Sequence, residues 1–278
     1  MHKTLSKIFD PLASGGQTFF LVAGPCVLEN EEMGFPIAEQ ILEITERLAI
    51  PYIFKASYRK ANRTKGESFT GIGDHKALTI LDNIRKRLNI PVLTDIHAVA
   101  EVQTASGFVD VLQIPAFLCR QTELLEATGA AGKVVNIKKG QFMSPESMQH
   151  AAEKVLKSGC NHILVTERGT TFGYNDLVVD FRSIAAMKKF AAPEVKVVLD
   201  VTHSLQQPNH RSGISGGVPE FSEALASAGI AVGADGIFLE THPSPHKAKC
   251  DADSMLPLDT LEKLLKKLVR IRKTVFES

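Results

Sequence analysis

Features that would place a protein in a specialised class are missing from this sequence. No apolar run approaches the roughly 20 residues that a helix needs to span a bilayer. The 32 Lys and Arg residues almost balance the 31 Asp and Glu residues, and a net charge of +1 argues against a nucleic-acid binder that relies on bulk basicity. The first ten residues lack the apolar segment of a signal peptide. We therefore expect a cytoplasmic protein with neither nucleic acid nor a membrane as partner.

Cysteine is scarce and scattered. The four cysteines are far apart in the chain, and no two form a CxxC pair; they are Cys26, Cys119, Cys160 and Cys250. In a chain of 278 residues without a secretion signal, this pattern indicates reduced thiols in a cytosolic protein.

Eight short apolar segments rich in β-forming residues recur along the chain, with helical patterns between most of them. Each segment is nearly continuous in apolar residues, which is typical of parallel strands covered on both faces. Eight strand–helix repeats in this length predict one (β/α)₈ TIM barrel domain over residues 1–278 rather than an open doubly wound sheet. The predicted strands are Phe19–Ala23, Tyr52–Lys55, Val92–Asp95, Val111–Ile114, Val134–Lys138, Ile163–Glu167, Val195–Asp200 and Gly236–Glu240.

The segments between and after these strands predict amphipathic helices. The clearest are Glu31–Leu48, His75–Leu88, Ser144–Lys157 and Leu258–Val275. Before the first strand, Thr4–Phe9 and Gln17–Phe19 flank a Ser-Gly-Gly turn. This pattern predicts a short N-terminal β-hairpin that caps the bottom of the barrel.

Cationic side chains follow three of the predicted strands. In a barrel, strand ends meet at one face, so Lys55, Lys138 and Arg168 would converge there together with Lys60. Two like charges about 4 Å apart repel by roughly 4 kcal/mol at an effective dielectric near 20, so the cluster requires an anion. A bound phosphate would meet this need, and so would carboxylates of the protein, for which the candidates are Asp95, Glu167 and Asp200.

A second group of polar residues follows strands that are neighbours around a closed barrel. It contains one thiol, one imidazole and two carboxylates, supplied by Cys26, His203, Glu240 and Asp251. This mixture suits a divalent transition metal such as Zn²⁺, Mn²⁺ or Fe²⁺. The four residues share no local spacing motif, and Cys26 taken alone would more often be a small buried apolar residue.

Short motifs in a fixed order make the chain resemble the 3-deoxy-D-manno-octulosonate 8-phosphate (Kdo 8-phosphate) synthases over nearly its whole length. The most specific is Lys60-Ala61-Asn62-Arg63, where the sister family of 3-deoxy-D-arabino-heptulosonate 7-phosphate synthases has Lys-Pro-Arg-Thr. The others are Gln113-Ile114-Pro115-Ala116-Phe117-Leu118, Asn136-Ile137-Lys138-Lys139, Glu167-Arg168-Gly169, Phe172-Gly173-Tyr174, Asp200-Val201-Thr202-His203 and Glu240-Thr241-His242-Pro243.

The resemblance implies a transferase, usually a homotetrameric (β/α)₈ barrel. Enzymes of this family condense phosphoenolpyruvate with D-arabinose 5-phosphate and water for lipopolysaccharide biosynthesis. Carried onto this chain, the residues that would hold phosphoenolpyruvate are Lys55, Ser57, Lys60, Gln113, Lys138 and Arg168. Those that would hold arabinose 5-phosphate are Asn62, Arg63 and Thr64, and Ala116 and Gln141 complete the predicted substrate-binding residues. The predicted catalytic residues are Lys60, Asp95, Lys138 and His203.

The family has a metal-independent class with Asn at the position of Cys26, and a metal-dependent class with Cys. This chain resembles the metal-dependent class, which implies that Cys26, His203, Glu240 and Asp251 bind the metal. Cys250 departs from that pattern, because a Cys before the aspartate is common in the metal-independent class. It is either a bystander or a competing soft ligand.

Three other functions share parts of this pattern. The heptulosonate synthases share the fold, the phosphoenolpyruvate site and the metal ligands, but Asn62 stands where they have Arg. A sialic-acid-type synthase takes an acceptor without phosphate, which would leave Arg63 without a role. A non-catalytic sugar-phosphate-binding barrel would be expected to have lost some of these cations or ligands.

Overall fold

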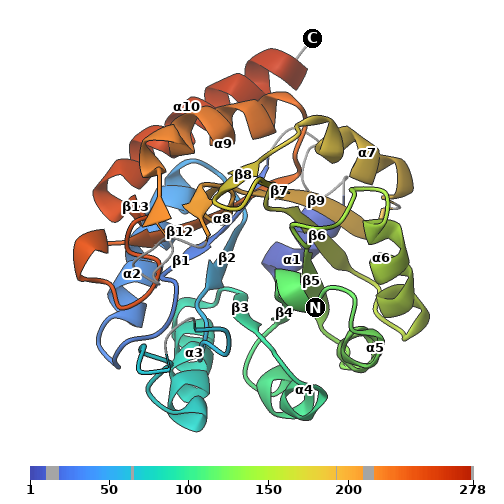
Figure 1. Ribbon diagram of the computed structural model, residues 1–278. Coiled ribbons are helices and arrows are strands. Elements are labelled where there is room, and N and C mark those ends of the chain that lie inside the picture. Colours follow the sequence, from blue (N-terminus) through green and yellow to red (C-terminus); the bar gives the residue numbers. More distant parts are fainter. Residues whose placement is uncertain (11–18, 64–65, 192, 209–215, 277–278) are drawn as a thin grey trace.

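Eight parallel strands form a closed ring in the computed structural model, which describes residues 1–10, 19–63, 66–191, 193–208 and 216–276 (Figure 1). Each strand pairs with the next in the order β1-β2-β3-β4-β5-β6-β9-β12, and β12 pairs back with β1. The strands are β1 (Phe20–Gly24), β2 (Tyr52–Lys55), β3 (Val92–Asp95), β4 (Val111–Ile114), β5 (Val134–Lys138), β6 (Ile163–Glu167), β9 (Val195–Asp200) and β12 (Gly236–His242). The predicted TIM barrel is confirmed, with six of the eight strands at the predicted residues.

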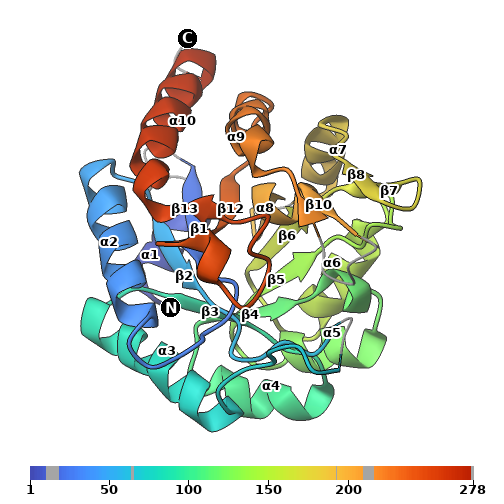
Figure 2. The ribbon, with the colours of Figure 1, turned by 60° about the vertical axis from the view of Figure 1, so that its left-hand side comes forward.

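Helices surround the ring, as Figures 1 and 2 show from two directions. They are α2 (Gly34–Arg47), α3 (Asp74–Leu88), α4 (Val99–Ser106), α5 (Thr122–Gly129), α6 (Met148–Lys157), α7 (Arg182–Phe190), α9 (Ser222–Ala231) and α10 (Leu261–Phe276). The short α8 (Val201–Ser204) follows β9 directly. The four 3₁₀ turns described are η1 (Ala116–Leu118), η2 (Pro219–Phe221), η3 (Pro245–Lys247) and η4 (Leu258–Thr260).

Short additional strands decorate the loops. The antiparallel pair β7 (Thr170–Phe172) and β8 (Asp176–Val178) follows β6, and β10 (Gln206–Gln207) pairs with β11 (Gly216–Gly217) after α8. A last short strand, β13 (Leu256–Pro257), extends the sheet beside β12.

The N-terminal segment differs from the prediction. Lys3–Phe9 forms a helix, α1, so the first strand of the expected β-hairpin is wrong, and its turn lies outside the described residues. Leu5, Ile8 and Phe9 are buried in one cluster with side chains from the inside of the barrel, such as Phe20 and Val22 of β1. Spacing of three and four residues places these three side chains on one face of a helix, and that face closes the bottom of the barrel.

The hydrophobic core has two layers. The larger lies between the ring of strands and the outer helices, and the smaller fills the interior above α1. All four cysteines are buried and free of disulfides. Within the described ranges, no helix is both long enough and apolar enough to span a membrane.

Candidate active site

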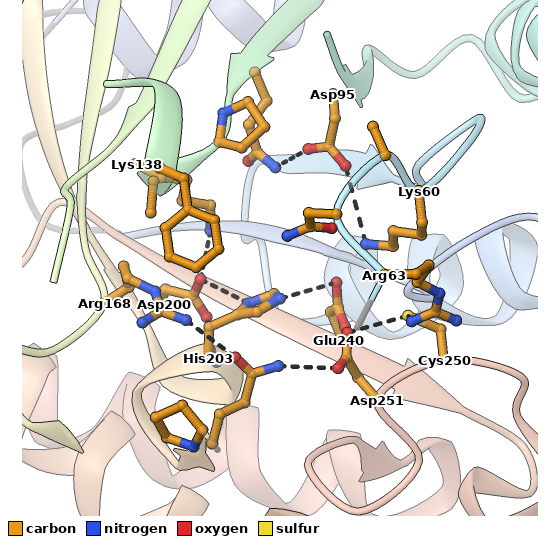
Figure 3. A pocket seen from close by; sticks show the side chains of 18 of the residues that line it. Lys60, Arg63, Asp95, Lys138, Arg168, Asp200, His203, Glu240, Cys250 and Asp251 are labelled. Atoms are coloured by element: carbon orange, nitrogen blue, oxygen red, sulfur yellow. Dashed lines mark hydrogen bonds and ion pairs between the residues drawn. The ribbon is translucent and has the colours of Figure 1, made fainter. Parts of the chain in front are cut away.

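A cavity of about 790 Å³ opens at the carboxyl ends of the strands, where a TIM barrel carries its chemistry. Its wall contains most of the residues singled out from the sequence (Figure 3). Those residues are Lys55, Lys60, Asn62, Arg63, Asp95, Gln113, Ala116, Lys138, Gln141, Arg168, His203, Glu240 and Asp251. The structure therefore brings together side chains from the ends of seven of the eight barrel strands or from the segments that follow them.

Two of the described predicted residues, Ser57 and Cys26, do not line this cavity. Ser57 is fully buried below it and donates a hydrogen bond to Asp95. Cys26 is also buried, and its Sγ donates to Oδ2 of Asp251 at 3.0 Å. Thr64 lies outside the described residues.

Carboxylates meet three of the four clustered cations. Lys55 forms an ion pair with Glu240, and Lys138 Nζ lies 2.5 Å from Oδ2 of Asp200. Lys60 Nζ lies 4.0 Å from Oδ2 of Asp95. Asp95 and Asp200 therefore neutralise part of the positive charge of the clustered cations, as the sequence allowed.

The third candidate, Glu167, serves another purpose. It pairs with the buried Lys139 at 3.4 Å, and its Oε1 accepts backbone N–H groups of Arg168 and Gly169. Glu167 therefore shapes the loop after β6 rather than neutralising the cations at the cavity wall.

Burial shifts the pKa values of these groups in opposite directions. It lowers the pKa of Lys138 to about 8, although Asp200 acts to raise it. Burial alone would raise the pKa of Asp95, but Lys60 and Lys55 hold it well below its usual range. The same holds for the pKa of Asp200, which His203 and Lys138 keep low. The cavity wall therefore carries fixed negative charge beside a lysine that changes charge near neutral pH.

Of the four clustered cations, Arg168 has a buried nitrogen without a hydrogen-bond partner in the described part of the chain. The side chain is 5% exposed, and Nη2 donates to Oε1 of Gln206 at 3.0 Å. Among the described residues, the buried Nη1 has no hydrogen-bond partner. Because an unpaired buried donor is costly, above all on a charged group, this atom indicates that an anion belongs in the cavity.

The four predicted metal ligands lie in two overlapping groups. His203, Glu240 and Asp251 form one, with His203 Nε2 3.6 Å from Oε1 of Glu240. Cys26, Cys250 and Asp251 form the other. Asp251 belongs to both and has a left-handed backbone (φ 48°), a conformation that costs a residue with a side chain about 1–2 kcal/mol. Such local strain is often found at functional sites.

One further observation shows that these residues fit a cation. Glu240 is fully buried, and its Oε2 has no hydrogen-bond partner within the described part of the chain. Lys55 pairs with the other oxygen, Oε1, so the carboxylate is partly neutralised, but an unpaired buried Oε2 is still unfavourable unless a further partner such as a cation meets it. The imidazole, the thiols and the carboxylates around it are all donors that transition metals accept.

A chain of buried polar side chains runs along neighbouring strands beneath the cavity, from β6 through β5 and β4 to β3. Thr166 Oγ1 donates to Oδ1 of Asn136 at 2.6 Å, and Nδ2 of Asn136 donates to Oε1 of Gln113 at 2.7 Å. Gln113 in turn donates to Asp95, which also accepts the hydroxyl of Ser57. The sequence analysis assigned no role to Asn136 or Thr166, which hold Gln113 and, through it, Asp95.

Gln206 is another residue that the sequence analysis missed. Its Nε2 donates to Oδ1 of Asp251 at 3.0 Å, while its Oε1 accepts from Arg168. It thus joins the anion side of the cavity to the candidate metal ligands. Its position at the start of a Gly- and Pro-rich loop was the available signal.

Comparison with known proteins agrees with this geometry. Residues 5–277 match the model of the DAHP synthetase I family. The chain belongs to this family. Curated relatives within this family align with nearly the full length of the chain.

The protein of Syntrophotalea carbinolica is 49% identical over 265 residues, which is 95% of each chain. That of Desulfotalea psychrophila is 48% identical over 268 residues, 96% of this chain and 95% of the relative. That of Koribacter versatilis is 49% identical over 264 residues, 94% of each. All three family members are named 2-dehydro-3-deoxyphosphooctonate aldolase, so the predicted membership of the Kdo 8-phosphate synthases is confirmed.

Proposed function

We propose that this protein condenses phosphoenolpyruvate with D-arabinose 5-phosphate and water to give Kdo 8-phosphate and inorganic phosphate, a step that serves lipopolysaccharide biosynthesis. The observation that carries the proposal is the buried Nη1 of Arg168, unpaired among the described residues, in a cavity also lined by Lys55, Lys60 and Lys138. The curated relatives, which carry the aldolase name over almost their whole length, support the choice of substrates.

Phosphoenolpyruvate carries a phosphate and a carboxylate, and the cationic wall suits both. Arg168 would donate to a phosphate oxygen through its free N–H, a charge-assisted bond that is stronger than a neutral one. Lys138 lies at the end of β5, which pairs with β6, the strand that Arg168 follows. It would provide a second positive charge. Both side chains are nearly buried, so their attraction for an anion is little screened by water.

The acceptor half of the cavity is formed by the loop after β2. Asn62 and Arg63 both line the cavity, and Arg63 is held in place by the backbone oxygens of Phe69 and Lys249 at 2.9 and 2.8 Å. We propose that Asn62 faces the sugar and that Arg63 binds its phosphate. Thr64, which follows directly, belongs to the same proposed subsite.

In the proposed reaction, C3 of phosphoenolpyruvate forms a bond to the aldehyde carbon of the sugar. The aldehyde oxygen gains a proton, and the oxygen of a water molecule bonds to C2 and loses one. The C2–O bond to phosphate then breaks, and phosphate leaves with that electron pair. The hydroxyl on C2 gives up its remaining proton and becomes the ketone carbonyl of the product. Lys60, Asp95 and His203 are the groups at the cavity wall that could move these protons.

We further propose that Cys26, His203, Glu240 and Asp251 hold a divalent metal, with Zn²⁺, Mn²⁺ and Fe²⁺ as the candidates. A bound metal of this kind would polarise or orient the aldehyde, or activate water. Asp200 would orient the imidazole, because it lies 2.8 Å from Nδ1 of His203 and leaves Nε2 toward Glu240. We also propose, from the family resemblance, a homotetramer that works in the cytoplasm.

The observation on Arg168 can be tested by substitution. Arg168→Met should raise the KM for phosphoenolpyruvate at least tenfold, since about 1.4 kcal/mol already corresponds to that factor and a charged hydrogen bond contributes more. Arg182→Met is the matched control, because Arg182 lies at the surface of α7 and pairs with Asp180, outside the cavity wall. An unchanged KM in a folded Arg168→Met protein would contradict the proposal.

A further inference from the structure

A second thiol lies beside the candidate metal ligands. Cys250 Sγ is 2.7 Å from Sγ of Cys26 and 3.2 Å from Oδ2 of Asp251. Cys26, Cys250 and Asp251 form one of the two potential metal-binding groups, and Cys250 is only 4% exposed. The sequence left open whether Cys250 is a bystander or a ligand, and its surroundings separate the two.

A bystander cysteine would behave as a small apolar side chain. Cys250 does pack in a small cluster with Val27 and Met255. Its sulfur, however, also contacts three polar groups: the Cys26 thiol, the Asp251 carboxylate and the guanidinium of Arg63, whose Nη1 donates to it at 3.0 Å. Figure 3 shows this arrangement, with Arg63 and Asp251 on either side of Cys250.

The two sulfur atoms lie close enough to reach one ion. Zinc binds thiolate sulfur at about 2.3 Å in tetrahedral geometry, so two sulfur ligands of one ion lie roughly 3.8 Å apart. The present separation of 2.7 Å is shorter, so the two side chains would move apart by about 1 Å on binding an ion. Asp251 links the sulfur pair to the group of His203 and Glu240, which places the two sets of donors around a common carboxylate.

We propose that Cys250 is a further ligand of the metal, so that Cys26 and Cys250 present two thiolates to the same ion. This rests on the metal site of the proposed function and goes beyond the four ligands that the family resemblance implies. Thiolates select soft or borderline ions, whereas carboxylates and water suit Mn²⁺. The second thiolate therefore biases this site toward Zn²⁺ or Fe²⁺ and away from Mn²⁺.

The test counts thiolates on a bound metal by spectroscopy. Full-length protein is reduced, stripped of metal with a chelator and titrated with Co²⁺ in the absence of oxygen, and the sulfur-to-cobalt charge-transfer absorption is recorded. Cys250→Ser and Cys26→Ser should each reduce the absorption at saturation to about half of the wild-type value. Cys160→Ser is the matched control, since the hydrogen-bond partners of this buried thiol within the described residues are backbone oxygens, those of Lys133 and His162.

A second measurement concerns selectivity. In competition with a metal-binding dye, Cys250→Ser should weaken Zn²⁺ binding by about tenfold or more while changing Mn²⁺ binding much less. Cys250→Ala serves the same purpose if the serine variant folds poorly, and circular dichroism shows which variants are folded.

The outcomes separate the two proposals. If the Cys250 variants keep the full wild-type absorption and Cys26→Ser loses all of it, the site has one thiolate and the role of Cys250 is refuted, while the proposed function stands. If wild-type protein shows no sulfur-to-cobalt absorption at all, the proposed metal site is itself wrong.

Discussion

The buried polar chain under the cavity leads to a prediction about both stability and substrate binding. Asn136 is fully buried, accepts a hydrogen bond from Thr166 and donates one to Gln113. Asn136→Leu keeps a side chain of similar size but removes both bonds. The Gln113 oxygen and the Thr166 hydroxyl then remain buried without this partner.

The magnitude follows from the cost of unsatisfied groups. Each buried polar atom left unpaired costs about 1–3 kcal/mol, so Asn136→Leu should lower the free energy of unfolding by about 3 kcal/mol. Thr166→Val leaves only the Asn136 oxygen unpaired and should cost about 2 kcal/mol. In the double variant, residue 166 has no hydroxyl that could be left unpaired. The loss in free energy of unfolding should therefore be at least about 1 kcal/mol smaller than the losses of the two single variants added together.

The assay is equilibrium unfolding in urea at one fixed protein concentration, combined with steady-state kinetics. Because Gln113 donates to Asp95 and lines the cavity, a reoriented Gln113 should raise the KM for phosphoenolpyruvate more than that for the sugar phosphate. Two results would refute the idea that these residues act as one chain. One is a loss in free energy of unfolding for the double variant equal to the sum of the single losses, and the other is a loss below about 1 kcal/mol for Asn136→Leu.

Three further predictions concern charge, metal and acceptor. Lys138, with a pKa near 8, is protonated below that pH, so kcat/KM for phosphoenolpyruvate should fall as pH rises through about 8; Lys138→Arg, which stays charged, should remove this fall in a pH profile. Chelator should abolish activity and Mn²⁺, Fe²⁺ or Zn²⁺ should restore it, whereas full activity after metal removal, verified by elemental analysis, would exclude a required metal. Asn62→Arg should lower kcat/KM for arabinose 5-phosphate at least tenfold by filling the acceptor side of the cavity, and an unchanged value would show that Asn62 does not face the sugar.

The strands and their polar ends could be predicted because they depend on local pattern. A continuous apolar run such as Val134–Ile137 followed by Lys138 specifies a buried strand with a charged end, and eight such runs leave few possible folds. The same reasoning missed α1 because the Ser-Gly-Gly turn was given more weight than the spacing of Leu5, Ile8 and Phe9, which is that of a helix.

The rest of the site depends on register and on long-range contacts, which no local pattern contains. Asn136 meets Gln113 because β4 and β5 pair in a register that aligns these two residues. Gln206 meets Asp251, and Cys26 meets Cys250, across loops whose paths the sequence does not specify. The ligand set was therefore implied by the family resemblance, and the contact between the two thiols became visible only in the structure.

The most direct test of the proposed reaction is the rate of phosphate release from phosphoenolpyruvate with two competing acceptors. Metal-loaded wild-type protein should release phosphate when D-arabinose 5-phosphate is added and show little release with erythrose 4-phosphate. Release that depends on erythrose 4-phosphate instead, or no release with either sugar, would contradict the account.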